Sequence, residues 1–264
     1  MTSLTTTTLF ASGALQFAFE KATTEGKITI LVLFFLSLFS WTIIITKFRQ
    51  LRLARKWARR FFAAYGSTRD PLDIQRRGDT FSAAPAYRLY MRAANELEYH
   101  LNKNPVLVNG QTRISAASFE AVKVTLEEAA AEEAMALEKG MIVLSTAVAG
   151  GPFIGLLGTV WGVMETFAGI ARANTASLTA MAPGVAGALI ATVTGLLAAI
   201  PDMFAYNFMV TTIRAITQQL DGFSTRYATQ IEHVYVDNRD IEDKIAAALK
   251  RAEKTGDTPA PPAS

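Results

Sequence analysis

The sequence predicts an all-α integral membrane protein with three transmembrane helices. Three spans, 28–46, 140–164 and 173–201, contain no charged residue and are 19, 25 and 29 residues long. A helix needs roughly 18 or more apolar residues to cross about 30 Å of hydrocarbon. The 26 Lys and Arg and the 23 Asp and Glu all lie outside these spans, although half of the 264 residues are apolar. A soluble single-domain fold is therefore excluded.

The distribution of basic residues predicts the topology. Seven Lys and Arg fall within 47–60 with no acidic residue among them, whereas only two precede the first span. Lys and Arg number 16 in 47–139 and seven in 203–264, with Arg172 alone between the second and third spans. By the positive-inside rule, the N-terminus lies outside and the C-terminus in the cytoplasm. A signal peptide is not expected, because the basic residues flank the wrong side of the first span.

The chain then divides into eight segments. Their order is an outer N-terminus over 1–27, transmembrane helix 1 over 28–46, a cytoplasmic helical domain over 47–139, transmembrane helix 2 over 140–164, an outer loop over 165–178, transmembrane helix 3 over 179–204, a cytoplasmic C-terminal helix over 205–254 and a disordered tail over 255–264. Apolar residues at helical spacing in 9–22 favour an interfacial helix, with a disordered leader as the alternative.

Gly and Pro divide the cytoplasmic domain into three expected helices, near 47–66, 82–103 and 112–139. The last has no breaker before the second span, so one long helix is expected to enter the membrane. No strand pattern stands out anywhere in the chain.

Past the third span, apolar residues repeat with spacings of three and four, close to a heptad. Such a seam must pack against other helices in water, so the membrane helices are expected to continue as a cytoplasmic stem. The members of the seam are Met209, Ile213, Ile216, Leu220, Phe223, Tyr227, Ile231 and Val234.

Composition excludes several classes of function. There is no Cys and there are only two His, so disulfides, Cys-ligated zinc, iron–sulfur clusters and thiol nucleophiles are absent, and we expect no metal and no cofactor. The basic excess is explained by membrane topology, so nucleic acid is not an expected partner. The three spans contain no His and no pair of carboxyls for hydrolysis within the bilayer. The protein is therefore not expected to be an enzyme.

The second and third spans carry stripes of small residues, which let membrane helices approach closely. Thr159 lies within the first stripe and Thr192 beside the second; the structural alternative for Thr159 is a bond to its own helix backbone. The stripes suggest contact with another helix or a narrow wet path. Their members are Gly151, Gly155, Gly158 and Gly162 in the second span, and Gly184, Ala188, Ala191, Gly195 and Ala198 in the third.

Asp202 is the only Asp, Glu, Lys, Arg or His between Ala173 and Ile213. A carboxyl at membrane depth is costly, so proton or ion handling is one interpretation. Because Asp202 lies near the cytoplasmic end of the span, the other interpretation is a carboxylate that is hydrated or paired with Arg214 or a basic residue of a neighbouring helix.

These segments resemble a known family. The stretch GPFIGLLGTVWGVMETFAGIA, followed by MAPGVAGALIATVTGLLAAIPDMFAYN, closely resembles the second and third transmembrane segments of the ExbB/TolQ branch of the MotA/TolQ/ExbB proton channel family. SWTIII in the first span is similar to the corresponding TolQ-like segment. The resemblance covers roughly 90 residues closely, and the middle of the cytoplasmic domain only in general character.

The resemblance implies a stator subunit of the bacterial inner membrane, with a periplasmic N-terminus. It implies a homopentamer of three-span subunits around a central pore that holds a single-span partner of the ExbD/TolR type, with a TonB or TolA type energy transducer as a further partner. The family's pore threonines correspond to Thr159 and Thr192, and we add Asp202 to the expected proton pathway. The small residues expected to pack helices and face the pore are Gly151, Gly155, Gly158, Gly162, Gly184, Gly187 and Gly195.

Two positions depart from the family pattern. Gly187 stands where many ExbB and TolQ proteins have a glutamate, and Asp202 stands where they have alanine. The first departure favours the alternative of a non-conducting membrane scaffold, whereas the presence of Thr159, Thr192 and Asp202 favours the proton channel. The sequence does not separate nutrient uptake of the ExbB type from envelope maintenance of the TolQ type. Three spans argue against a flagellar role, since motor-type stators usually have four.

Overall fold

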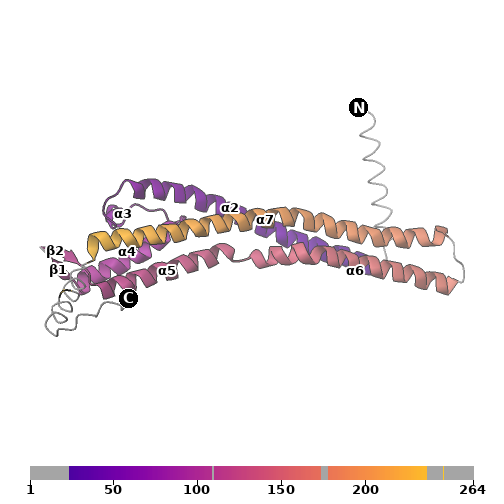
Figure 1. Ribbon diagram of the computed structural model, residues 1–264. Coiled ribbons are helices and arrows are strands. Elements are labelled where there is room, and N and C mark those ends of the chain that lie inside the picture. Colours follow the sequence, from indigo (N-terminus) through magenta and orange to yellow (C-terminus); the bar gives the residue numbers. More distant parts are fainter. Residues whose placement is uncertain (1–23, 109, 174–177, 237–245, 247–264) are drawn as a thin grey trace, which may run out of the picture. The chain divides into compact units, whose positions relative to one another are not determined.

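The computed structural model describes residues 24–108, 110–173, 178–236 and 246. The predicted interfacial helix, the end of the C-terminal helix and the predicted tail lie outside these residues. Within them the chain is largely helical (Figure 1), with three helical stretches long and apolar enough to cross a membrane. The elements are α2 (Thr24–Gly66), α3 (Asp73–Arg77), α4 (Pro85–Lys103), β1 (Val106–Val108), β2 (Gln111–Arg113), α5 (Ala116–Glu138), α6 (Met141–Ala173) and α7 (Leu178–Tyr235).

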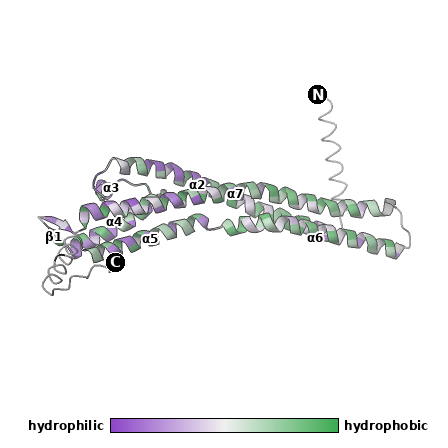
Figure 2. Cartoon of the chain, viewed as in Figure 1, coloured by the Kyte–Doolittle hydropathy of each residue, from purple (hydrophilic) through white to green (hydrophobic). Residues whose placement is uncertain are grey.

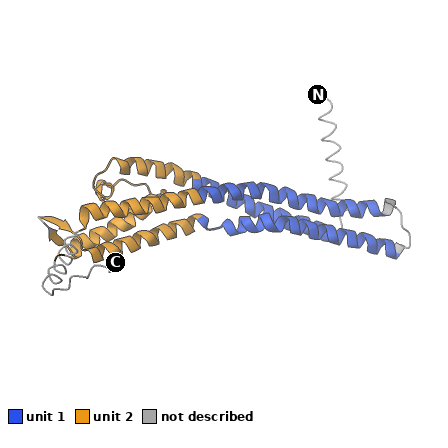
Figure 3. Ribbon diagram, in the orientation of Figure 1, with its two compact units in different colours: residues 1–51, 138–213 blue, residues 52–137, 214–264 orange. Residues whose placement is uncertain are grey.

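The chain forms two compact units (Figure 3). The first unit comprises residues 1–51 and 138–213, and the second comprises 52–137 and 214–264. The three charge-free spans belong to the first unit, and Figure 2 shows α6 and the first part of α7 mostly in the hydrophobic colours. Most of the charged residues belong to the second unit.

The first unit has large apolar side chains outside and small residues inside. Phe39 of α2, Phe153 of α6 and Leu197 of α7 are 66%, 72% and 67% exposed, whereas Ala188 and Ala191 are buried. This distribution is typical of a membrane bundle, because lipid accepts large apolar groups and small residues let helix backbones approach. The predicted transmembrane character of the spans is consistent with it.

A break separates α5 from α6, so the expectation of one long helix entering the second span is wrong. Gly140 has a φ of 87°, which is a left-handed backbone conformation that ends a helix. Glycine adopts this conformation at little cost, whereas other residues are strained in it. By contrast, Pro183 and Pro201 both lie inside α7 without ending it. Membrane helices tolerate proline where neighbouring groups compensate for the missing N–H donor.

An aromatic cluster forms the core of the second unit. Phe223 and Tyr227 of α7 stack with their rings 5.6 Å apart, and Tyr65 of α2 lies edge-on to both. The seam predicted past the third span is buried from Met209 to Ile231, but Val234 is 38% exposed and Tyr235 is buried instead. The end of the seam was predicted wrongly because a straight helix of 3.6 residues per turn drifts away from a 3.5-residue repeat.

A short antiparallel pair of strands was not predicted. Strands β1 and β2 pair Val106 with Arg113 and Val108 with Gln111. The buried Ile114 follows and donates its N–H to the Tyr235 carbonyl at 2.8 Å. Strands of three residues are too short to show the alternation that identifies a strand in sequence.

Asp70 ties the loop after α2 to the end of α7. The Tyr235 hydroxyl donates to Asp70 Oδ1 at 2.7 Å, and Arg76 Nη1 lies 2.6 Å from Asp70 Oδ2. Burial and the hydrogen bond to Asp70 raise the pKa of Tyr235 to about 12. The phenol therefore stays a hydrogen-bond donor throughout the physiological pH range.

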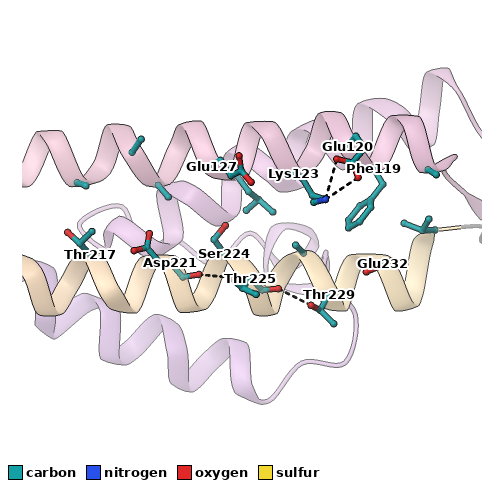
Figure 4. A pocket seen from close by; sticks show the side chains of 17 residues that line it. Phe119, Glu120, Lys123, Glu127, Thr217, Asp221, Ser224, Thr225, Thr229 and Glu232 are labelled. Atoms are coloured by element: carbon teal, nitrogen blue, oxygen red, sulfur yellow. Dashed lines mark hydrogen bonds and ion pairs between the residues drawn. The ribbon is translucent and has the colours of Figure 1, made fainter.

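A cleft of about 690 Å³ lies between α5 and α7 in the second unit. Figure 4 shows Glu127 of α5 and Asp221 of α7 on its walls, with Lys123 paired to Glu120 along α5. The alanine side chains of both helices leave the space open. The cleft is acidic and is separate from the residues that the sequence singled out.

Candidate functional site

The two threonines singled out in the sequence lie side by side in the first unit. The Thr159 hydroxyl on α6 contacts the Thr192 hydroxyl on α7, and either oxygen can be the donor. Thr192 Oγ1 also lies 3.2 Å from the Gly155 carbonyl, and Thr159 Oγ1 lies 3.2 Å from the Ala188 carbonyl and 3.3 Å from that of Gly155. The hydroxyls therefore bond acceptors on both helices. Thr159 bonds its own helix backbone, as the alternative predicted, and also bonds α7.

Glycines position the threonine pair by letting α6 and α7 touch through their backbones. A Cβ added at Gly155 would lie 2.9 Å from the Ala191 carbonyl oxygen and 3.1 Å from the Thr192 Cα. On the facing helix, a Cβ at Gly195 would lie 2.7 Å from the Gly151 carbonyl oxygen. Main-chain atoms cannot rotate away as a side chain can. Any larger residue at these positions would separate the helices and pull the two hydroxyls apart.

The remaining stripe residues continue the same contact. Gly162 faces Ala188, with 2.7 Å between the added Cβ and the alanine methyl, and Gly184 faces Thr166. Gly187 is buried in α7. The structure thus places these small residues in packing within one chain. Their predicted role at a pore concerns an assembly and stays a prediction.

Helix α2 packs against this pair of helices through residues that the sequence did not single out. A Cβ at Gly158 would lie 3.1 Å from the Thr29 methyl group, and the Thr29 hydroxyl donates to its own helix, to Glu25 O at 2.8 Å. Leu33 and Ser40 of α2 are fully buried. One face of α2 is therefore covered by protein.

Asp202 does not join the threonine pair. It follows Thr192 by ten residues on α7, which corresponds to about 15 Å along a helix. Its side chain faces Ser40 of α2 and is 1% exposed. In the part of the chain that the structure describes, Asp202 forms no ion pair with Arg214 or with a basic residue of a neighbouring helix, and its role in proton handling stays a prediction. The site residues thus fall into two places, the threonine pair and the contact of α7 with α2.

The arrangement offers hydroxyls and a carboxyl, but no ligand set for a metal. Within residues 24–108, 110–173, 178–236 and 246, no three His, Cys, Asp or Glu side chains come together. The threonine pair has two protons and several acceptor oxygens, so its hydrogen bonds can be exchanged without moving the helices. Such a pair can relay a proton or order water.

Comparison with known proteins agrees with these features. A family model described as the MotA/TolQ/ExbB proton channel family matches residues 91–222, which include both threonines and Asp202. The chain is 33% identical over 217 residues to the Tol-Pal system protein TolQ of Haemophilus influenzae, covering 80% of this chain and 90% of that relative. It is 32% identical over 232 residues to the TolQ protein of Pseudomonas aeruginosa, covering 88% and 90%.

A third relative bears the other name of this branch. The chain is 32% identical over 211 residues to the biopolymer transport protein ExbB of Pseudomonas putida, covering 79% of this chain and 60% of that relative. Together with the family match, these likenesses confirm the resemblance seen in the second and third spans. The chain belongs to the MotA/TolQ/ExbB proton channel family.

Proposed function

We propose that the chain is an ExbB/TolQ-like stator subunit of the bacterial inner membrane. With a single-span partner of the ExbD/TolR type it forms a proton channel, and it couples the proton motive force to an outer-membrane process such as TonB-dependent nutrient uptake. The names of the relatives, biopolymer transport and the Tol-Pal system, support this class of role. The observation that carries the proposal is the contact of the Thr159 and Thr192 hydroxyls between two charge-free spans, 140–164 and 173–201.

In the proposed mechanism, the threonine pair accepts a proton on one side and releases it on the other by exchanging donor and acceptor roles. The pair can hand a proton on, but it contains no carboxyl to hold one. Gly187, at the family's glutamate position, supplies none either. We therefore assign the essential carboxyl of the pore to the partner helix, with five copies of this chain around it. A TonB or TolA type transducer would receive the resulting motion.

Thr192→Val tests the proposed relay. It removes the hydroxyl that contacts Thr159 while nearly conserving volume, so assembly should persist. We expect proton flux in liposomes containing chain and partner to fall about tenfold, the change in rate produced by 1.4 kcal/mol of lost hydrogen bonding. Thr192→Ser should restore most of the flux.

Thr194→Val is the matched control. Thr194 lies on the same helix, and its hydroxyl donates only to its own backbone, to Ile190 O at 2.7 Å. Its loss should leave proton flux within about twofold of wild type, since a single hydrogen bond to the same helix contributes about 1 kcal/mol or less to stability and joins no second hydroxyl. Equal losses in the two valine variants would show that the contact between the threonines has no special role.

The second candidate is a non-conducting membrane scaffold. It is favoured by Gly187 and by the use of the small-residue stripes for packing within one chain. Native mass spectrometry of the chain co-expressed with a single-span partner separates the two. Five copies with one or two partner chains, together with proton flux, support the channel. A persistent monomer or dimer without flux supports the scaffold.

The proposed topology can be tested with single cysteines, because the natural chain has none. Gly169 of α6 and Leu107 of β1 are both exposed. With the N-terminus outside, Gly169→Cys should react with a membrane-impermeant maleimide added to the periplasmic face of spheroplasts. Leu107→Cys should react only after lysis. The reverse pattern would invert the proposed orientation, whatever the chain conducts.

A further inference from the structure

Ser40 of α2 and Asp202 of α7 form a polar contact in an otherwise apolar part of the first unit. Ser40 is 0% exposed and Asp202 is 1% exposed. The Ser40 hydroxyl faces the Asp202 carboxyl. However, the two groups miss hydrogen-bond geometry, and Ser40 Oγ and Asp202 Oδ1 are left without a partner among the described residues. Buried polar atoms without a partner are rare in proteins, so this pair requires an explanation.

Among the described residues, the carboxyl forms no ion pair with the helices around it. On α2, the charged residue on the face of Ser40 is Lys47, seven residues further along, or about 10 Å. On α6, no charged residue occurs from Met141 to Met164. On α7 itself, the titratable neighbour on the same face is Tyr206, one turn away, which is neutral as a phenol.

A proton suits this site better than a metal ion. An ionised carboxylate here would be a buried charge with one hydroxyl as its partner, which is costly in an apolar medium. As a neutral acid, Asp202 can donate to Ser40 Oγ after a small rotation, which gives both atoms a partner. A sodium ion would require several more oxygen ligands than one carboxyl and one serine hydroxyl provide.

We propose that Asp202 and Ser40 form a proton-binding site on the α2-facing side of α7, separate from the threonine pair. The proton is held between two helices and exchanges with water only when α2 moves away from α7. The site thereby makes the packing of the first membrane helix depend on protonation. This holds whether or not the threonine pair conducts, so it goes beyond the proposed function.

Infrared spectroscopy of the complete chain in nanodiscs tests the site directly. Aspartate labelled with carbon-13 at its side-chain carboxyl shifts the C=O band of a protonated aspartic acid without altering the fold. At neutral pH we expect one such band, lost in Asp202→Asn and shifted in frequency in Ser40→Ala. The control is Asp221→Asn, an exposed position further along α7, which should keep the band.

Hydrogen exchange in D₂O and a change of salt give two further measurements of the band. In D₂O, the isotope shift of the band should develop slowly, because the proton is buried. The absence of a protonated band at neutral pH, or its survival in Asp202→Asn, would overturn the proposal. Loss of the band on replacing KCl by NaCl at constant pH would also overturn it, in favour of sodium. If Asp202→Asn does not fold, the labelled wild type and Ser40→Ala still decide.

Discussion

Replacing Gly155 with leucine is expected to eliminate folded protein from the membrane fraction. The Cβ alone would lie within 3.3 Å of three main-chain or Cα atoms of α7, those of Ala191, Thr192 and Gly195. Leucine adds three more carbons in the same direction. Overpacking against side chains typically costs about 1–3 kcal/mol, and here no side chain is available to yield, so the cost should reach the top of that range or exceed it.

Two alanine variants test whether an added Cβ lowers thermal stability at Gly155 and not at a control position. Gly155→Ala should lower the thermal stability of the detergent-purified chain, since its methyl group would meet the Ala191 carbonyl at 2.9 Å. Gly169→Ala is the matched control on the same helix, because nothing lies within 4 Å of an added Cβ there. The control should be neutral or stabilising by up to about 1 kcal/mol, the difference in helix propensity between glycine and alanine.

The size-exclusion profile at increasing temperature is the measurement for both variants. Opposite shifts in the temperature at which the folded peak disappears would support the backbone contact between α6 and α7. Equal shifts would show that Gly155 is merely a helix residue and that the small-residue stripe does not pack there. The threonine hydroxyls would then have to be held together by other contacts.

The sequence predicted the membrane spans and the close contact of α6 with α7, because charge-free runs and glycine spacing are strong signals. Charge-free runs marked the spans, and glycines at spacings of four, three and four predicted a close helix contact, which holds around Gly155 and Gly158. The pairing of Thr159 with Thr192 could not follow from spacing, because it depends on the relative depth of α6 and α7. Only the resemblance to the family suggested their common role.

The inner face of α2 was not predicted, for a physical reason. In a membrane helix, residues that face lipid and residues that face protein are both apolar, so hydropathy does not distinguish them. Leu33, which is fully buried, and Phe34, which is 63% exposed, are equally hydrophobic neighbours. The Ser40 hydroxyl could have indicated this face, since a polar group within an apolar span is expected to face protein and not lipid. The break at Gly140 was likewise missed because glycine is common inside membrane helices.

Replacing Phe61 with alanine is expected to destabilise the second unit more than replacing a side chain on the surface of that unit. Phe61 is 0% exposed, and its ring lies 5.4–5.9 Å from those of six neighbours. These neighbours are Phe62, Tyr65, Phe81, Tyr87, Tyr90 and Phe223. Truncation of a buried phenylalanine costs about 3–5 kcal/mol, a large share of the roughly 5–15 kcal/mol that stabilises a typical protein.

Phe62→Ala provides the control, because the same side chain is removed one residue later from a half-buried position. The Phe62 ring contacts those of Phe61 and Phe223. Trypsin reports local opening of the unit, since Arg76 and Arg77 lie exposed in the short helix α3. Cleavage there should accelerate strongly in Phe61→Ala and only modestly in Phe62→Ala. Equal acceleration would mean that Phe61 contributes no more to stability than Phe62. The remaining rings would then hold α2 and α7 together.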